Sequence, residues 1–265
     1  MEKNKNPKIS ICIPTYEMKG YGINYLFHLL KSIKKQTYSN YEIVISDHSK
    51  NTEIEDSIKK ITSMDIKYLR NEEDRGKSSC NINNAIRNST GEIIKPLFQD
   101  DMILNNDVLS KIAYLYTTEE SFTWGGLGFV HIDETNSVHK NRYPPLIPSM
   151  NEELALGVNT FGCPSVCFFK KDLPKTLFDE NLVWLMDCEF YHRMKVSYGN
   201  PILIGDYDIA VRVWKESFTA DVSDNTKKSE EDYVKQKHFP IIETVTEVMS
   251  GAVDEIDEQK EQSEE

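Results

Sequence analysis

Short apolar runs alternate with amphipathic segments along the first hundred residues of the chain. The apolar runs predict four strands, at residues 8–14, 41–46, 66–69 and 93–98. The segments between them place apolar side chains at helical spacing and predict helices at residues 24–35, 54–61 and 78–88. Strand and helix in strict alternation predict an α/β fold with a mostly parallel central sheet flanked by helices.

The pattern is less regular beyond residue 101. We expect a helix over residues 106–117, a strand over 124–132 whose glycines let backbones approach closely, and a helix over 188–198. Residues 140–148 contain three prolines and predict a loop that covers the site. Pro96 cannot donate a hydrogen bond to a ladder, so it predicts a bulge or an irregular pairing in the fourth strand.

Polar residues follow the carboxyl ends of all four predicted strands, which is where parallel sheets bind ligands. Thr15-Tyr16 follow the first strand, Asp47 the second, residues 70–75 the third and Asp100-Asp101 the fourth. Two carboxylates at a buried strand end need compensation, and a divalent cation with hard oxygen ligands, Mg²⁺ or Mn²⁺, is the simplest. The alternative is a turn at Asp101 with a solvated Asp100.

Four segments, taken in order, resemble the inverting GT-A glycosyltransferases called family 2. They are Ile11–Tyr16, Gln36–Ser49, the region from Gly76 that ends in Gln99-Asp100-Asp101, and a C-terminal segment made of Gly162–Ser165 followed by Phe178–Asp187. The resemblance covers roughly residues 8–215, and the order and spacing of the segments carry it. It implies a GT-A (Rossmann-like) sheet, and metal-assisted transfer of a sugar from a nucleoside diphosphate sugar to an acceptor hydroxyl with inversion.

By this resemblance, Pro14, Thr15, Tyr16 and Asp47 form the nucleoside pocket. The aromatic ring would stack on the base, and the carboxylate would accept a hydrogen bond from it. The structural alternatives are a turn residue for Tyr16 and an Asx-turn for Asp47. Ser46-Asp47-His48 departs from the paired Asp and Gly that are commoner in the family.

The diphosphate and metal would lie next to this pocket. Arg75 and Lys77 precede a helix whose free N-terminal amides, with these cations, suit a diphosphate, although a solvated basic pair is the alternative. Asp101 would bind the Mn²⁺ or Mg²⁺ directly, and Asp100 would bind the ribose or act through water. Phe98 stands where the family's fuller pattern has another Asp.

Asp187 is the residue that the resemblance identifies as the general base. Its structural alternative is an N-cap of the following helix, a role that Asp fills well. Glu189 is the competing base, but residues two apart on a helix point about 200° from one another, so both cannot face the acceptor. We assign Trp184 and Glu189 to the acceptor side, with a core position as the alternative for Trp184. Residues 209–214 resemble a late strand of the family, in which Arg is often followed two residues on by His, and here Trp214 takes the place of that His after Arg212.

The resemblance also divides the chain into three parts. Residues 1–101 would be the nucleotide-sugar-binding half, and residues 102–215 the acceptor-binding and catalytic half of the same domain. Residues 216–265 would form a C-terminal helical extension and an acidic disordered tail, because residues 252–265 hold seven acidic side chains and one lysine. The extension either packs on the body or mediates a homodimer.

The composition and net charge of the chain limit which partners and which location we expect. The net charge of −12 argues against nucleic acid as a partner. No apolar run approaches the ~20 residues that a transmembrane helix needs, and the first eight residues do not look like a signal peptide. We therefore expect a cytoplasmic protein, at most peripheral to a membrane. The five scattered cysteines predict reduced thiols.

Three functions remain for the structure to weigh. The first is the glycosyltransferase, with a UDP-sugar as the favoured donor and a saccharide or lipid-linked acceptor. The second is a nucleotidyltransferase, although the first strand leads into Pro14-Thr15-Tyr16 and not into a Gly-rich phosphate loop. The third is a non-catalytic nucleotide-sugar or saccharide-binding module, because a fold does not fix a function.

Overall fold

The computed structural model describes residues 4–138, 144–214 and 222–239. Its first part alternates strands and helices as the sequence predicts. The strands are β1 (Ile9–Thr15), β2 (Tyr41–Asp47), β3 (Ile66–Arg70) and β4 (Ile93–Pro96), and the helices are α1 (Gly22–Ile33), α2 (Glu53–Ile58) and α3 (Ser78–Arg87). The short 3-10 helix η1 (Met18–Gly20) joins β1 to α1. All four strands are parallel to their neighbours in this part.

The second part is more irregular. It contains β5 (Met102–Ile103), α4 (Val108–Thr118), β6 (Trp124–Ile132), η2 (Leu154–Leu156), η3 (Pro164–Val166), β7 (Cys167–Lys170), α5 (Met186–Tyr198), β8 (Ile202–Arg212) and α7 (Asp224–His238). The sequence predicts β6 at its observed bounds, but it gives no sign of β7. The predicted helix at residues 188–198 begins two residues after the start of α5. The late strand expected at residues 209–214 covers only the end of β8. Residues 240–265, with the predicted acidic tail, lie outside the described residues.

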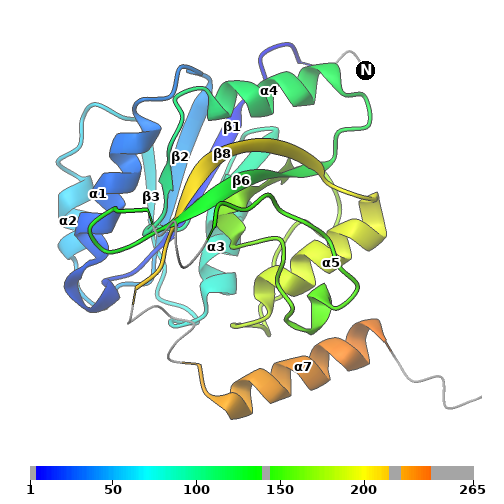
Figure 1. Cartoon of the computed structure of the whole chain (residues 1–265). Coiled ribbons are helices and arrows are strands. Elements are labelled where there is room, and N and C mark those ends of the chain that lie inside the picture. Colours follow the sequence, from blue (N-terminus) through cyan, green and yellow to red (C-terminus); the bar gives the residue numbers. More distant parts are fainter. Residues whose placement is uncertain (1–3, 139–143, 215–221, 240–265) are drawn as a thin grey trace, which may run out of the picture.

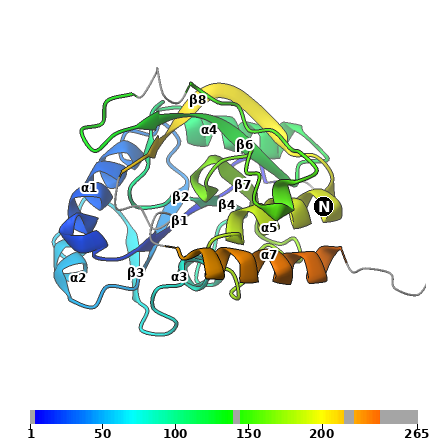
Figure 2. The same ribbon diagram turned by 60° about the horizontal axis from the view of Figure 1, so that its bottom comes forward.

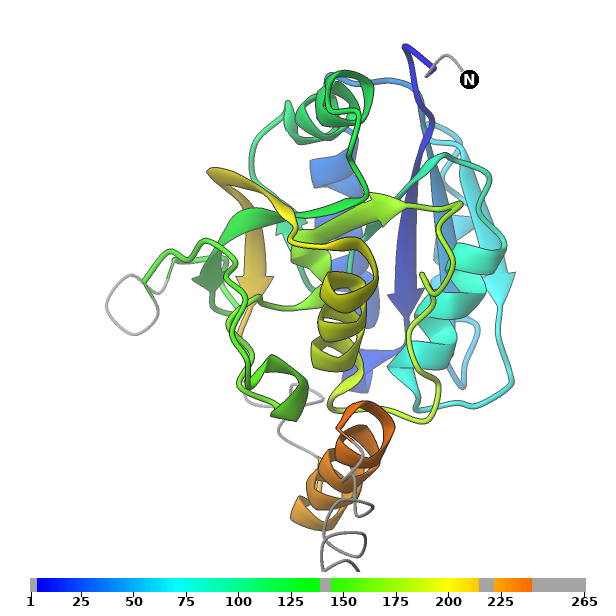
Figure 3. The ribbon, with the colours of Figure 1, turned by 90° about the vertical axis from the view of Figure 1, so that its right-hand side faces the viewer.

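Both parts contribute to one eight-stranded sheet, in the order β3-β2-β1-β4-β7-β6-β8-β5. Four of its strand pairings are parallel and three are antiparallel, and the antiparallel ones all involve β5 or β7. Helices cover the sheet, with α1 and α2 beside the parallel strands and α4 above them (Figure 1). Turned by 90°, the strands are seen with α3 on one side (Figure 3). The expected α/β architecture is confirmed.

The irregularity in the sheet lies away from Pro96. Pro96 is the last residue of β4 and pairs in register with Cys12, so the prediction of a bulge there is wrong. The strand ends at Pro96, and β7 pairs only with Ile93 and Ile94, so no ladder bond is needed from the proline nitrogen. The register shifts instead between β6 and β8, around Gly128.

The glycines of β6 allow the close approach that the sequence predicts. A Cβ at Gly125 would lie 2.4 Å from the Ile202 carbonyl oxygen and 2.4 Å from the Phe168 ring. A Cβ at Gly128 would lie 2.4 Å from the Asp206 carbonyl oxygen. Larger residues would therefore push β8 away from β6.

One large apolar core joins the two parts. It runs from the β-branched residues of β1 and β2 to the aromatic residues of β7 and α5, such as Phe168, Phe190 and Tyr191. Helix α7 lies alongside α5 at the lower edge of the molecule (Figures 1 and 2). In the described part of the chain, no helix combines the length and apolar character needed to cross a membrane.

Candidate functional site

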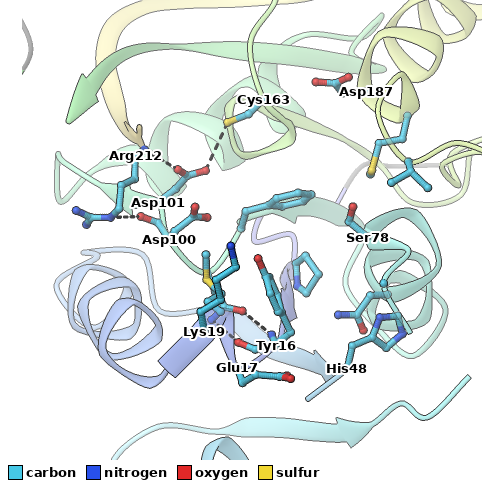
Figure 4. Close-up of a pocket in the computed structure, with 18 of the residues that line it drawn as sticks. Tyr16, Glu17, Lys19, His48, Ser78, Asp100, Asp101, Cys163, Asp187 and Arg212 are labelled. Carbon is cyan, nitrogen blue, oxygen red and sulfur yellow. Dashed lines mark hydrogen bonds between the residues drawn. The ribbon is translucent and has the colours of Figure 1, made fainter. Parts of the chain in front are cut away.

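A cavity of about 700 Å³ lies at the carboxyl ends of β1 and β4. Residues from both parts of the chain line it, including Pro14, Tyr16, His48, Arg75, Ser78, Phe98, Asp100, Asp101, Cys163, Trp184, Asp187 and Arg212. In the close-up view, Tyr16 and His48 lie across the cavity from Cys163 and Asp187, with Asp100 and Arg212 along a further side (Figure 4). Most of the residues predicted for the site are thus brought together by the fold.

Gln99 fixes the segment that follows β1 against the segment that follows β4. Its Oε1 accepts a hydrogen bond from the Tyr16 amide at 2.6 Å, and its Nε2 donates to the Tyr16 carbonyl at 3.0 Å. The same Nε2 donates to the Gly22 carbonyl at 3.1 Å, at the start of α1. Gln99 is buried, so this amide holds Tyr16 at the cavity wall next to the acidic pair.

The residues predicted for the donor divide into two groups. Pro14, Tyr16 and Arg75 line the cavity, and Arg75 also lies 3.3 Å from the Glu72 carboxylate. Thr15 is fully buried and lies beneath the cavity wall. Lys77 pairs with the Asp74 carboxylate at 3.1 Å and does not line the cavity.

Asp47 is also buried beneath the wall, where it serves a structural role. One carboxylate oxygen accepts the Ser49 amide at 2.8 Å, which is the predicted Asx-turn alternative. The other accepts the Tyr68 hydroxyl at 2.5 Å and lies 3.7 Å from the Arg70 guanidinium. The neighbouring His48 lines the cavity in place of Asp47.

Arg212 organises the acidic pair from β8. Its amide donates to Asp101 Oδ1 at 3.0 Å, and its Nε donates to the Asp100 carbonyl at 2.9 Å. Its guanidinium lies over the Tyr25 ring at 4.4 Å and donates to the Asp133 carbonyl and the Asn136 side chain. Asp101 Oδ2 accepts the Cys163 thiol at 3.4 Å. The end of β8 and the end of β4 therefore form one rigid wall.

The two carboxylates carry more negative charge than their surroundings balance. Burial, and after it the charge of Asp101, raises the pKa of Asp100 to about 7, despite the nearby Arg212. Burial also raises the pKa of Asp101. Two hard oxygen donors with unbalanced charge, facing a cavity, suit Mg²⁺ or Mn²⁺. Among the residues that the structure describes, no cluster of three or more His, Cys, Asp or Glu completes a metal cage, so other ligands would come from substrate or water.

Trp214 stands where the family often has His, and its side chain packs against aromatic rings. Its indole packs edge-on against the rings of Tyr21 and Tyr25, at centroid distances of 5.7 and 5.8 Å. Trp214, Tyr25 and Met18 form a small buried apolar cluster beside the cavity, with Tyr16 packed against it. The residue that replaces the family's His therefore supports Arg212 by packing, because Arg212 lies over the same Tyr25 ring.

Asp187 lies in the first turn of α5 and faces the cavity from the side opposite Tyr16 (Figure 4). Leu185 occupies the N-cap position, so the N-cap interpretation of Asp187 is wrong. Its oxygens accept the Cys188 amide at 2.8 Å and the Asn159 side-chain amide at 2.9 Å. Burial raises the pKa of Asp187 to about 6, and these hydrogen bonds oppose the rise. A carboxylate of this kind is ionised at neutral pH and is still a competent proton acceptor.

Glu189 does not reach the cavity, which contradicts its assignment to the acceptor side. It is fully buried and accepts hydrogen bonds from Arg193, Lys237 and His238. It therefore holds α7 against α5. Trp184 does line the cavity, and its ring lies close to Gly157 and 5.8 Å from the Lys227 ammonium group of α7.

The sequence reasoning missed several cavity residues. Cys163 lies in the segment Gly162–Ser165, and the resemblance of that segment to the family could have pointed to it. His48 directly follows Asp47 and could have been found by position. Lys19 lies in η1 with a positive φ of 52° and does not stand out in the pattern. Asn159 does not line the cavity but donates to Asp187 from an irregular loop, and it does not stand out either.

Comparison with known proteins identifies relatives of this chain. The sequence profile described as Glycosyl transferase family 2 matches residues 10–178. The Escherichia coli UDP-Glc:alpha-D-GlcNAc-diphosphoundecaprenol beta-1,3-glucosyltransferase WfgD is 24% identical over 123 residues, which are 46% of this chain and 47% of that protein. Across the curated relatives that we compared, the chain spans from 23% to 69% of their length.

Solved structures share the fold at low sequence identity. The Staphylococcus aureus TarS fragment 1–349 in complex with UDP superposes with a TM-score of 0.58 at 20% identity, covering 90% of this chain and 73% of that one. The mannosyltransferase PcManGT from Pyrobaculum calidifontis, in complex with GDP-Man and Mn²⁺, gives a TM-score of 0.59 at 15% identity, covering 80% and 59%. At such identities the likeness establishes the fold alone.

Proposed function

Because this chain belongs to glycosyl transferase family 2, we propose that it transfers a sugar from a nucleoside diphosphate sugar to an acceptor hydroxyl with inversion. One observation carries the proposal. A single cavity has an acidic pair after the end of β4, of which Asp101 is buried, and, on another side, a partly buried carboxylate whose pKa is raised to about 6. The first arrangement suits a diphosphate with its cation, and the second suits a general base.

The donor would lie along the ends of β1 and β4. Tyr16 would stack on the base. The guanidinium of Arg75 and the N-terminal amides of α3, which begins at Ser78, would contact the diphosphate. The fold shared with a UDP complex of TarS supports a UDP-sugar as donor. His48, which follows β2 and lines the cavity, would face the base in place of Asp47.

Asp100 and Asp101 would hold the divalent cation. When bound, such an ion neutralises the charge that develops on the departing diphosphate. The Mn²⁺ in the PcManGT complex supports this choice of metal class, and Mg²⁺ fits the same oxygen donors. Arg212 would keep the two carboxylates in place through its contacts with both residues.

Asp187 would act as the base on the acceptor side. Its carboxylate would take the proton of the acceptor hydroxyl while that oxygen forms a bond to the anomeric carbon and the bond to the diphosphate breaks. Since Asp187 lies across the cavity from Tyr16, attack would come from the face opposite the leaving group, which gives inversion (Figure 4). Asn159 would orient the carboxylate through its 2.9 Å hydrogen bond.

The acceptor would pass Trp184 on its way to Asp187. An indole in a cavity wall is a common platform for a sugar ring. The name of WfgD describes a diphosphoundecaprenol-linked acceptor, and we propose the same class here, a saccharide carried on a lipid diphosphate. Such an acceptor would require only peripheral contact with a membrane.

The test is a panel of UDP- and GDP-sugars, each incubated with the protein and Mn²⁺ or Mg²⁺. Release of free nucleoside diphosphate that depends on the metal supports sugar transfer. Release of pyrophosphate would instead establish nucleotidyl transfer. Binding of the nucleotide without any turnover, with lipid diphosphate saccharides present, would leave only the binding module.

A further inference from the structure

Helix α7 is joined to the acceptor side of the cavity by a carboxylate with three amide partners. Glu230 Oε1 accepts the Val183 amide at 2.8 Å, and Oε2 accepts the Trp184 amide at 2.9 Å and the Leu185 amide at 2.8 Å. Glu230 is only 6% exposed. A buried carboxylate with this many charge-assisted hydrogen bonds is strongly held.

Within the described residues, no backbone hydrogen bond of these amides competes with Glu230. They immediately precede α5, whose N-cap is Leu185, a residue without a side-chain acceptor. The positive end of the α5 dipole also favours a carboxylate at this place. The turn that leads into the helix carrying Asp187 is therefore held by α7, from a residue 45 positions further along the chain than Leu185.

Two further contacts lie on the same face of α7. Tyr233 and Lys237 donate to the Asp179 carboxylate at 2.9 and 2.5 Å, and residues 230, 233 and 237 follow the i, i+3, i+7 spacing of one helix face. Lys237 also donates to Glu189 at 2.8 Å. Both ends of the segment from Asp179 to Glu189 are thus attached to α7, and its middle lines the cavity through Val183, Trp184 and Asp187.

We propose that Glu230 is a positioning residue for sugar transfer, which holds the backbone of Val183–Leu185 so that Trp184 and Asp187 face the acceptor. The expected effect on the rate of sugar transfer rests on the proposed function. The expected effect on the backbone of residues 183–185 does not. Glu230 does not line the cavity and touches no substrate. Its loss would therefore change the acceptor side and leave the donor side intact.

The test compares Glu230→Gln with Asp232→Asn, a matched loss of one charge at an exposed position of the same helix. The glutamine keeps one oxygen, so it cannot accept all three amides. Hydrogen exchange, resolved to residues 183–185, is expected to rise about tenfold in Glu230→Gln and to stay unchanged in Asp232→Asn. The affinity for UDP with Mn²⁺ is expected to match the unaltered protein in both variants.

Kinetics then separates positioning from stability. With the most rapidly hydrolysed UDP-sugar of the panel, Glu230→Gln is expected to lower kcat about tenfold or more at unchanged KM, and Glu230→Asp to do the same because its shorter side chain cannot reach the amides. Unchanged exchange at residues 183–185, an equal rise in exchange over the whole described chain, or an unchanged kcat would each overturn the proposal. If the unaltered protein turns over no donor even with lipid diphosphate saccharides present, the proposed function fails, and the exchange measurement still decides the role of Glu230.

Discussion

The two sides of the cavity that we propose for the donor and for the acceptor are built in different ways. On the donor side, Pro14, Tyr16, Asp100 and Asp101 follow directly from the ends of adjacent parallel strands. On the acceptor side, Asp187 depends on Asn159 from a loop and, through the preceding turn, on Glu230 from α7. The first side is a product of sheet topology, and the second is a product of long-range side-chain contacts.

The difference has a physical consequence. A strand end is fixed by ladder hydrogen bonds on both sides, so it stays in place when one side chain is replaced. A turn held by one distant carboxylate opens when that carboxylate is lost, because its amides have no second partner. We therefore expect variants on the donor side to act through the loss of their own charge. Variants of the residues that attach α7 are expected to act by letting the turn before α5 move.

The largest effect is expected at the base. Asp187→Asn should lower sugar transfer about 10³-fold, because the amide cannot accept the proton of the acceptor hydroxyl. The affinity for UDP with Mn²⁺ should not change, since Asp187 lies across the cavity from Tyr16. Steady-state rates and calorimetric titration measure the two quantities. Full activity in Asp187→Asn would refute the assignment of the base.

A smaller effect is expected on the donor side from Asp100→Asn and Asp101→Asn. Each should weaken Mn²⁺-dependent binding of UDP by about 10- to 100-fold, because one charged oxygen donor to the cation is lost. Asp172→Asn, an exposed acid outside the cavity, is the control. If both site variants kept the metal dependence of the unaltered protein, the cation would have to bind elsewhere.

The pH dependence of sugar transfer should reflect the ionisation of Asp187. Burial raises the pKa of Asp187 to about 6, and the base acts only in its ionised form. At saturating Mn²⁺ we therefore expect kcat to fall about tenfold per pH unit below pH 6 and to level off above it. A profile that is flat from pH 5 to pH 8 would show that proton removal by Asp187 does not limit the rate.

The smallest effect on transfer is expected from Glu42, at the opposite edge of the parallel strands. Burial alone would raise the pKa of Glu42, but hydrogen bonds from Ser10, Lys8 and Thr90 lower it to about 2. Glu42→Gln should cost about 2 kcal/mol of stability and leave the rate of transfer unchanged. Urea unfolding at a series of pH values measures this cost.

The sign of the pH dependence at Glu42 follows from its lowered pKa. The ionised carboxylate stabilises the folded chain fully above about pH 4.5, and this contribution is lost as the pH falls toward 2. The difference in unfolding free energy between Glu42→Gln and the unaltered protein should therefore shrink over that range. Glu120→Gln, at an exposed position, should show no such trend. A constant difference would contradict the role of the hydrogen bonds.

Much of the fold could be predicted from the alternation of apolar and polar residues. The strands of the first part and β6 follow from this pattern, and so do the site positions of Tyr16, Asp100 and Asp101 at strand ends. The prediction of a bulge at Pro96 failed because the proline closes its strand. Strand β7, with only four residues, is too short for its periodicity to be read.

The sequence by itself determined which residues are candidates for the chemistry, because acidic side chains after buried strands need compensation wherever the chain places them. Only the tertiary structure decided which of them face the cavity. It turned Asp47 toward Tyr68 and Glu189 toward α7, and it left His48 and Asp187 in the wall. The reason is that a side chain's partners across the core are set by contacts between distant segments, which the local pattern of a sequence does not contain.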